Sequence, residues 1–349
     1  MSEIKLTAFS PGSGCGCKIS PKDLEEILSG AGAFTAPFEE LLVGNDSRDD
    51  AAVYDIGGGQ AIISTTDFFT PIVNDPFQFG QIASVNAISD VYAMGGEPLM
   101  AIGLLGWPLK KLSNDIAKQV VAGARSVCAE VGIPLAGGHS IDISEPIFGL
   151  AVTGRVAVDQ LKRNDTAQPG AKLFLSKPIG VGILTTAEKK GLVLPQHTTT
   201  AVESMTRLNS IGAEFGKMAV VQAMTDVTGF GLLGHLGEMC AGSKVNARIE
   251  AAKVPTIDEL DFYLEKGSTP GGTDRNWASY GHQVGPISER GKKILCDPQT
   301  SGGLLTAVAP EGVDEFLKVA KEAGLELTSF GEILPRGADE TGAFIQVVE

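Results

Sequence analysis

The sequence predicts a mixed α/β (α+β) fold of two domains joined by a short polar linker. The chain has 349 residues, with 43% hydrophobic and 20% charged residues, which is ordinary for a globular protein of two domains. Segments with strand and helix patterns alternate along most of its length. The polar stretch VDQLKRNDTAQPG interrupts this alternation and ends in Pro-Gly. We therefore expect an N-terminal arm at 1–18, one domain at 19–157 and a second at 170–349.

The first elements follow the arm, whose glycines and serines carry no regular period. Ser20 and Pro21 predict the start of a helix, and Gly30 predicts its end. Its apolar stripe is expected to consist of Leu24, Ile27 and Leu28.

The rest of the N-terminal domain alternates between the two kinds of element. We expect strands at 51–56 and 60–66, a helix at 81–94, a strand at 99–106, a helix at 113–131 and a strand at 147–156. Gly95 and Gly96 follow the first of these helices and are expected to stop it. The glycine-rich LAGGHS lies between the last helix and the last strand and is expected to form a turn.

The C-terminal domain begins after the linker. Its expected elements are a strand at 172–176, helices at 181–190, 197–214 and 229–241, and strands at 245–250, 303–309 and 326–334. The segment CDPQTSGGLL at 296–305 predicts a structural turn before a strand, because it places Pro and two Gly there.

The composition excludes several classes of function. A formal net charge of −14 argues against nucleic acid as a partner. No apolar run approaches the roughly 20 residues that span a membrane, and the N-terminus lacks an apolar signal core. Five cysteines are an odd number, so reduced thiols in a cytoplasm are the better interpretation than a disulfide framework. Cys128, Cys240 and Cys296 are expected to be buried packing residues.

Aspartates recur where apolar segments begin or end. They are Asp49 and Asp50 in SRDDAAV, Asp67 in STTDFF, Asp90 in NAISDVYAMGG and Asp226 in TDVTGFG. Each taken alone is more often a cap of a helix or turn. The repetition of the pattern favours carboxylates that converge on Mg²⁺ and, through it, on a triphosphate. Arg48 and Lys18 are candidate cations for the phosphates, and Asn86 shares a helix face with Asp90.

Two further motifs add weaker evidence. Backbone N–H groups of a turn at Gly138-His139-Ser140 can cradle phosphate, although no P-loop is present. Cys15, Cys17 and Lys18 form a CGCK motif close to a predicted helix start, which favours a thiolate that acts as a nucleophile or handles a soft anion. A two-thiol metal clip or an arm without function are the alternatives. A lone CxC is a poor zinc site.

Taken together, the motifs GCGCK, SRDDAAV, STTDFF, NAISDVYAMGG, LAGGHS, TDVTGFGLLGH, GGTDRN and CDPQTSGG resemble, in this order, the selenophosphate synthetase family of the aminoimidazole ribonucleotide synthetase-like superfamily. The resemblance covers essentially the whole chain. It implies a two-domain fold whose N-terminal domain pairs across a homodimer into a β-barrel. It also implies that ATP, selenide and water yield selenophosphate, AMP and phosphate.

The resemblance also implies roles for individual residues. Cys15 and Lys18 match essential positions, and the role of Cys17 is left open. Asp50, Asp90 and Asp226 match magnesium ligands. The matching ATP contacts are Lys18, Ser47, Arg48, Asp49, Asp67, Asp90, Gly138, His139 and Ser140. The arm is then expected to fold over ATP as a lid.

Two other functions compete with this interpretation. One is another ATP-dependent small-molecule kinase or synthetase of the same superfamily, which would share the acidic cluster but does not explain GCGCK. The other is a thiol-based selenium carrier, which would need the CxC arm but not the separated aspartates.

Overall fold

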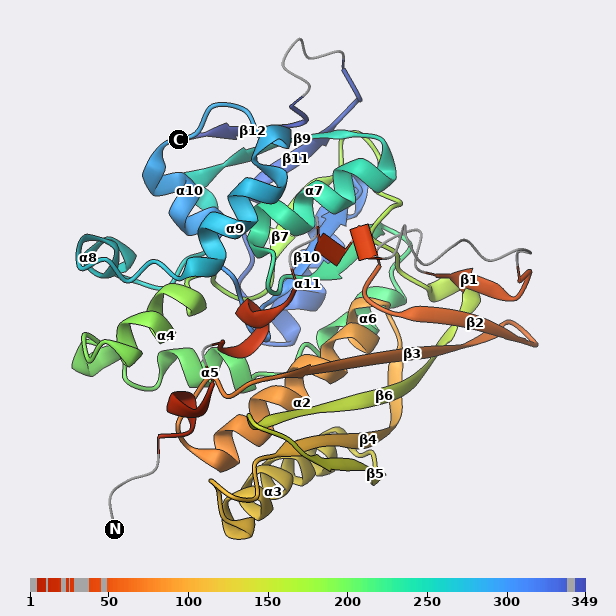
Figure 1. Cartoon of the computed structure of the whole chain (residues 1–349). Coiled ribbons are helices and arrows are strands. Elements are labelled where there is room, and N and C mark those ends of the chain that lie inside the picture. The colour runs from red at the N-terminus through yellow and green to blue at the C-terminus, as the bar shows by residue number, and fades with distance from the viewer. Residues whose placement is uncertain are drawn as a thin grey trace.

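The computed structural model describes residues 5–10, 12–19, 23–24, 26–27, 38–44, 49–337 and 343–349. These residues form two domains, each built on a mixed six-stranded sheet (Figure 1). The side chains of Cys15 and Cys17 lie outside this description, as do Ser20, Pro21, Leu28, Gly30, Ser47 and Arg48. No helix within the described ranges is both long enough and apolar enough to cross a membrane.

The N-terminal sheet has the strand order β1-β2-β3-β6-β4-β5. Its strands are β1 Leu41–Val43, β2 Ala52–Gly57, β3 Gln60–Phe69, β4 Glu97–Trp107, β5 Leu135–Asp142 and β6 Ile147–Ala157. All neighbours are antiparallel except β4 and β5, which are parallel and joined through a helix. This sheet forms the base of the functional site.

Two helices, α2 Pro76–Ala93 and α3 Asn114–Val131, cover one face of this sheet (Figure 1). Asp75 caps α2 by accepting from the Gln78 N–H, and Pro76 occupies its first turn. The two helices touch backbone to backbone, since a Cβ on Gly80 would lie 1.9 Å from the Val120 carbonyl oxygen. This close contact fixes the helix that carries Asn86 and Asp90.

The C-terminal sheet has the order β12-β9-β11-β7-β10-β8. Its strands are β7 Lys172–Leu175, β8 Val221–Asp226, β9 Asn246–Glu250, β10 Leu304–Val308, β11 Gly331–Leu334 and β12 Ile345–Val348. Its helices are α4 Val181–Lys189, α5 Thr200–Thr206, α6 Ile211–Gly216, α7 Gly231–Ser243, α8 Leu260–Glu265, α9 Gly271–Tyr280, α10 Glu289–Leu295 and α11 Val313–Glu322. Short 3-10 turns are η4 Val158–Gln160, η5 Pro195–His197, η6 Ala251–Lys253, η7 Gly281–Gln283 and η8 Pro310–Gly312.

The N-terminal arm crosses the molecule between the two domains (Figure 1). It contains two 3-10 turns, η1 Leu6–Phe9 and η2 Gly14–Cys17. Leu6 is fully buried, Thr7 Oγ1 donates to Asn74 Oδ1 at 2.8 Å, and the Gly14 N–H donates to the Thr70 carbonyl at 3.1 Å. The arm therefore docks on the N-terminal domain along much of its described length.

A polar network joins the domains behind the arm. Asn86 Oδ1 on α2 accepts from the Ser301 N–H at 2.8 Å, and Asn209 Nδ2 donates both to Ser89 Oγ on α2 and to the Gly302 carbonyl. Lys177 Nζ donates to the Ser301 carbonyl at 2.8 Å. The segment 296–303, predicted as a turn, is therefore a turn that also connects α2 with the C-terminal domain.

The strands and helices expected between 51 and 156 are all present, but the turn expected there is not. The LAGGHS segment is not a turn but most of β5, an edge strand paired with β4. Gly137 and Gly138 sit in this strand at φ +142° and +156°. A side chain at Gly138 would collide with Gly103 of β4, so here glycine permits close strand pairing rather than a turn.

Three expectations in other parts of the chain were wrong in detail. The helix expected at 197–214 is two helices, because Arg207 is extended (φ −74°, ψ 123°) and its carbonyl accepts from Lys177 Nζ. The strand expected at 326–334 is reduced to β11. Leu24 and Ile27 do lie in helical backbone, but both are exposed rather than buried.

Candidate active site

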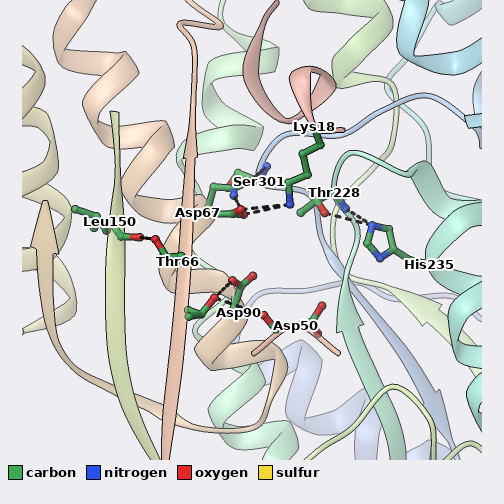
Figure 2. A network of polar contacts seen from close by, with 11 residues as sticks. Lys18, Asp50, Thr66, Asp67, Asp90, Leu150, Thr228, His235 and Ser301 are labelled. Atoms are coloured by element: carbon green, nitrogen blue, oxygen red, sulfur yellow. Dashed lines mark hydrogen bonds and ion pairs between the residues drawn. The ribbon is translucent and has the colours of Figure 1, made fainter. Parts of the chain in front are cut away.

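Four aspartates from four different parts of the chain approach one another at the junction of the domains. Asp50 precedes β2, Asp67 lies in β3, Asp90 lies in α2, and Asp226 ends β8 of the C-terminal domain. Figure 2 shows the first three of these near the arm residue Lys18. Folding therefore brings together carboxylates that are far apart in sequence.

Threonines and amides of the scaffold orient these carboxylates. Thr225 Oγ1 donates to Asp50 Oδ1 at 2.8 Å, and Thr65 Oγ1 donates to Asp90 Oδ2. Thr225 precedes Asp226 on β8, so the C-terminal strand both adds a carboxylate and holds Asp50. Neither threonine was predicted as a site residue, although Thr65 lies in the STTDFF motif and Thr225 in the TDVTGFG motif.

Asp67 is held from two sides. Asn86 Nδ2 donates to Asp67 Oδ2 at 2.6 Å, and Lys18 Nζ lies 3.3 Å from Asp67 Oδ1 (Figure 2). The ammonium of Lys18 is partly exposed, with 37% of its side chain accessible, so its ion pair with Asp67 can exchange. Lys18 therefore sits where it can reach either a carboxylate or an incoming phosphate.

Burial and mutual repulsion raise the pKa values of three of the aspartates. The pKa of Asp50 is raised well above its usual range, first by burial and then by the charges of Asp226, Asp49 and Asp90. Burial also raises the pKa of Asp90, followed by repulsion from Asp67 and Asp226. The pKa of Asp226 is raised to about 6, mainly by burial. Because each carboxylate disfavours ionisation of its neighbours, a bound cation would stabilise the ionised set.

The donor set fits a hard divalent cation. All its atoms are carboxylate oxygens, and Asp50 Oδ2 and Asp226 Oδ2 are buried without a hydrogen-bond partner. Such orphaned buried oxygens are costly unless a ligand satisfies them. Across the described ranges, no three His, Cys, Asp or Glu side chains are close enough to enclose a metal ion by themselves. Carboxylates offered singly or in pairs suit Mg²⁺, whose shell phosphate oxygens and water usually complete.

Two buried basic groups flank the cluster and were not predicted as site residues. Lys177 is almost fully buried, and burial lowers its pKa to about 7. His235 of the TDVTGFGLLGH motif is buried, and burial lowers its pKa to about 3. Its Nε2 accepts from the Thr228 N–H at 3.0 Å (Figure 2), so the neutral ring braces the loop after β8.

Asp49 lies beside the cluster, but both of its carboxylate oxygens accept hydrogen bonds from the backbone. Its carboxylate accepts from the backbone N–H groups of Asp50 and Asn164. Burial raises its pKa to about 7. In this structure Asp49 acts as a turn cap that ties the β2 entry to the linker. Its neighbours in the motif, Ser47 and Arg48, lie outside the described residues.

The segment Gly138-His139-Ser140 is not brought to the carboxylates within one chain. Asp67 of β3 is paired with Leu150 of β6, Leu150 with Gly103 of β4, and Gly103 with Gly138 of β5. Three strand spacings separate the two ends of this row, about 14 Å. Leu150 is fully buried between them. Gly138 and Ser140 therefore lie across a closed part of the core from Asp67.

The chain matches known proteins along both domains. Residues 48–156 match the AIR synthase related protein N-terminal domain, and residues 168–342 match the corresponding C-terminal domain. A selenide, water dikinase of Photorhabdus laumondii is 61% identical over 333 residues, covering 95% of each chain. One of Pseudomonas aeruginosa is 60% identical over 337 residues, covering 96% of this chain and 98% of its relative.

The fold is shared more widely than the sequence. The crystal structure of thiamine monophosphate kinase from Aquifex aeolicus superposes with a TM-score of 0.67 at 18% identity, covering 94% of this chain and 98% of that one. That likeness shows the two-domain fold alone. Both domain matches and the near-complete coverage at about 60% identity show that this chain belongs to the selenide, water dikinase family of AIR synthase related proteins.

Proposed function

We propose that this chain makes selenophosphate from selenide, ATP and water, and releases AMP and phosphate. Its place in the selenide, water dikinase family supports this reaction. One structural observation supports the proposal most directly. Asp50, Asp67 and Asp90 of the N-terminal domain lie close to Asp226 of the C-terminal domain. A site of buried carboxylates suits a triphosphate only if cations accompany it.

Asp50, Asp90 and Asp226 are proposed to hold Mg²⁺. The ion would neutralise the triphosphate as its phosphoryl groups leave. Thr225 and Thr65 orient Asp50 and Asp90 toward this role through their hydroxyl donors. Lys18 is proposed to exchange its partner when ATP binds. Its ammonium would leave the Asp67 carboxylate and compensate the charge of a phosphate. The proposed nucleotide contacts at Ser47, Arg48 and Asp49 immediately precede Asp50 in the sequence.

The arm is proposed to carry the selenium chemistry. Cys15 lies three residues before Lys18 in the η2 segment, and Lys18 contacts Asp67. An arm closed in this way would shield the reaction from water between its two phosphoryl-transfer steps. Cys15 would guide hydroselenide to the phosphoryl group or assist its transfer. Replacing Cys15 by Ser should abolish selenophosphate formation while ATP still binds, and a normal rate of formation would refute this role.

A homodimer is proposed to complete the nucleotide site. Outward-pointing residues of the N-terminal sheet form an exposed apolar face, with Ile56 at 59%, Phe68 at 51% and Ile141 at 50% accessible. Pairing this face with a second copy would form the barrel expected for the family. It would also allow Gly138-His139-Ser140, which are remote from their own carboxylates, to contact ATP held by the partner. We also propose that the boundary between the two domains lies at 157–170. The protein is proposed to work in the cytoplasm, where the thiols stay reduced.

The decisive experiment follows the fate of ATP. Protein, Mg²⁺, ATP and selenide are mixed anaerobically, and nucleotides and phosphorus species are resolved by ³¹P NMR. Formation of AMP, phosphate and a selenophosphate resonance is expected. ADP as the final nucleotide would indicate an ordinary kinase of the superfamily, and no nucleotide turnover would indicate a carrier.

A further inference from the structure

The GGTDRN motif has no role in the site as described so far, yet it lies beside the arm. It forms the first half of α9. Asn276 Nδ2 donates to the Gly229 carbonyl at 2.9 Å and to the Cys296 carbonyl at 3.1 Å. A side chain at Gly272 would lie 3.0 Å from Pro298. This helix is therefore fastened to the two loops, after β8 and before β10, that flank the carboxylates.

From this position Arg275 reaches the arm. One of its terminal guanidinium nitrogens donates to the Gly16 carbonyl at 2.9 Å. Gly16 lies between the two cysteines, in the last part of η2, where backbone carbonyls lack partners within the turn. A guanidinium stays charged and can only donate hydrogen bonds. This contact therefore holds the arm near α9.

Neighbouring contacts show that the arm is closed at this point. Gly14 is at φ +52°, and a Cβ there would lie 2.5 Å from both Ile72 Cδ1 and Thr300 Oγ1. The turn is therefore wedged between a residue of each domain. Two residues beyond Gly16, Lys18 pairs with Asp67 of the N-terminal domain. The Cys15–Lys18 segment thus spans from α9 on one side to β3 on the other.

We propose that Arg275 is a positioning residue that holds the Cys15–Lys18 segment closed against the C-terminal domain, above the carboxylate cluster. The closed arm holds the backbone of Cys15–Lys18 near the site, and loss of the guanidinium shifts the arm toward open conformations. The consequence for turnover rests on the proposed function. We call the hydrogen bond from Arg275 to the Gly16 carbonyl the latch. Its effect on the conformation of the arm is measurable without turnover.

The first test measures how readily the arm thiols react. Iodoacetamide modification of Cys15 and Cys17 is followed by peptide mass spectrometry, with the buried Cys128, Cys240 and Cys296 as internal references. A hydrogen bond from a charged donor at an exposed site corresponds to about a three- to tenfold change in the open population. Arg275→Ala should therefore raise the modification rate of the arm thiols by about that factor, and Arg275→Lys should restore part of the protection.

A matched control is Arg290→Ala, which removes an exposed arginine of the same domain that pairs with Asp261 instead of the arm. It should leave the modification rate at the wild-type value. Emission of Trp277, two residues from Arg275 on α9, and the thermal midpoint report whether the variant helix remains folded. An unchanged rate in a folded Arg275→Ala protein would overturn the latch.

The second test separates the latch from a direct contact with phosphate. Calorimetric titration of Mg²⁺ and ATP should give an unchanged affinity in Arg275→Ala, while the KM for selenide in AMP formation rises. A large loss of ATP affinity with unchanged thiol reactivity would mean that Arg275 binds the nucleotide, and would overturn the proposal. If the wild-type protein makes no AMP but the reactivity shift is present, the proposed reaction fails and the latch stands.

Discussion

At the scale of single residues, the site buries carboxylates whose charge disfavours burial. Asp50 and Asp226 each keep a buried oxygen without a hydrogen-bond partner. Such oxygens destabilise the protein unless a ligand compensates for their desolvation. The cost is understandable if the same oxygens bind cations during function, since ligand binding then offsets it.

The exchange Asp226→Asn removes a charge while keeping the side-chain volume, and should weaken Mg²⁺-dependent ATP binding by tenfold or more, about 1.4 kcal/mol at least. The physical reason is that one anionic ligand to the cation is lost. Isothermal titration with ATP, in the presence of Mg²⁺ and of EDTA, measures the effect. Asp115→Asn, an exposed aspartate on α3 that pairs with Lys118, should titrate like the wild type. Equal affinities for Asp226→Asn and the wild type would rule out a metal role for Asp226.

Asp297 offers a pH test away from the proposed metal ligands. This buried carboxyl accepts from the Gly182 N–H at the start of α4 and from Gln299 Nε2, and burial raises its pKa from 3.8 to about 8. Between these values the folded state holds a proton that the unfolded state has lost. The free energy of unfolding therefore falls as pH rises from about 4 to about 8, by up to about 1.4 kcal/mol per unit, and levels off above.

Asp297→Asn cannot ionise, so its stability relative to the wild type should increase as pH is raised from 5 to 8. Urea unfolding at four pH values in this range measures the difference. Asp115→Asn again provides the comparison, because its exposed carboxyl has a lowered pKa and stays ionised throughout this range. A difference between Asp297→Asn and the wild type that does not change with pH would contradict the buried, protonated state.

At the scale of elements, connections between domains decide where helices end. The pattern at 197–214 is helical by propensity, yet the chain breaks after Thr206. The Arg207 carbonyl accepts from Lys177, and Asn209 in the break donates to Ser89 and Gly302. Two short helices with these bonds replace one longer helix without them, which is a tertiary override of local propensity.

Asn209→Ala should therefore destabilise the protein by about 2 to 4 kcal/mol, since two buried hydrogen bonds are lost and the Gly302 carbonyl loses a donor. The midpoint of urea unfolding measures this, with the m-value as a check that the transition is unaltered. Asn114→Ala, at the exposed start of α3, should cost less than 1 kcal/mol. A loss for Asn209→Ala no larger than for Asn114→Ala would mean that the break has another cause.

At the scale of the whole molecule, the N-terminal sheet has one covered and one open face. Residues that point toward α2 and α3, such as Ile63, Leu150 and Val152, are buried, whereas Phe68, Met100 and Ile102 point away and are exposed. An open apolar face of this kind is typical of an association surface. The proposed dimer would cover it.

Met100→Glu should convert a dimer into a monomer at micromolar concentration, because an unpaired carboxylate would be buried in the interface. Sedimentation equilibrium measures the association constant. A matched substitution in the C-terminal domain, Lys318→Glu at an exposed position of α11, should leave it unchanged. A Met100→Glu protein that remains dimeric would place the interface elsewhere.

Subunit mixing tests whether one ATP touches two chains. If the carboxylates of one copy and Ser140 of the other form each site, Asp226→Asn and Ser140→Glu proteins should each be inactive alone. Random re-association makes about half of the dimers heterodimers, and each heterodimer has one intact site of two. AMP formation should therefore return to about a quarter of the wild-type rate. No recovery on mixing would show that Ser140 serves its own chain or no nucleotide.

Much of the N-terminal domain was predictable because its signals are local. Asp75, Pro76 and the glycines after Met94 bound α2, and alternation of apolar residues marks β3 and β6. The aspartates were identifiable as a set because each adjoins a regular element. The helices α8, α9, α10 and α11 and the strand β12 were not predicted; most are short, and their stability comes from packing rather than from an independent periodic pattern.

The sequence by itself determined the family, the acidic donor set and the thiol-bearing arm, because these reside in residue types and their order. Only the tertiary structure decided that LAGGHS is an edge strand, that Asp49 caps a turn, and that Arg275 reaches Gly16 across 259 positions of the chain. The physical reason is that strand pairing, burial and hydrogen bonds between distant segments depend on which surfaces meet in three dimensions, and local sequence does not specify the partner.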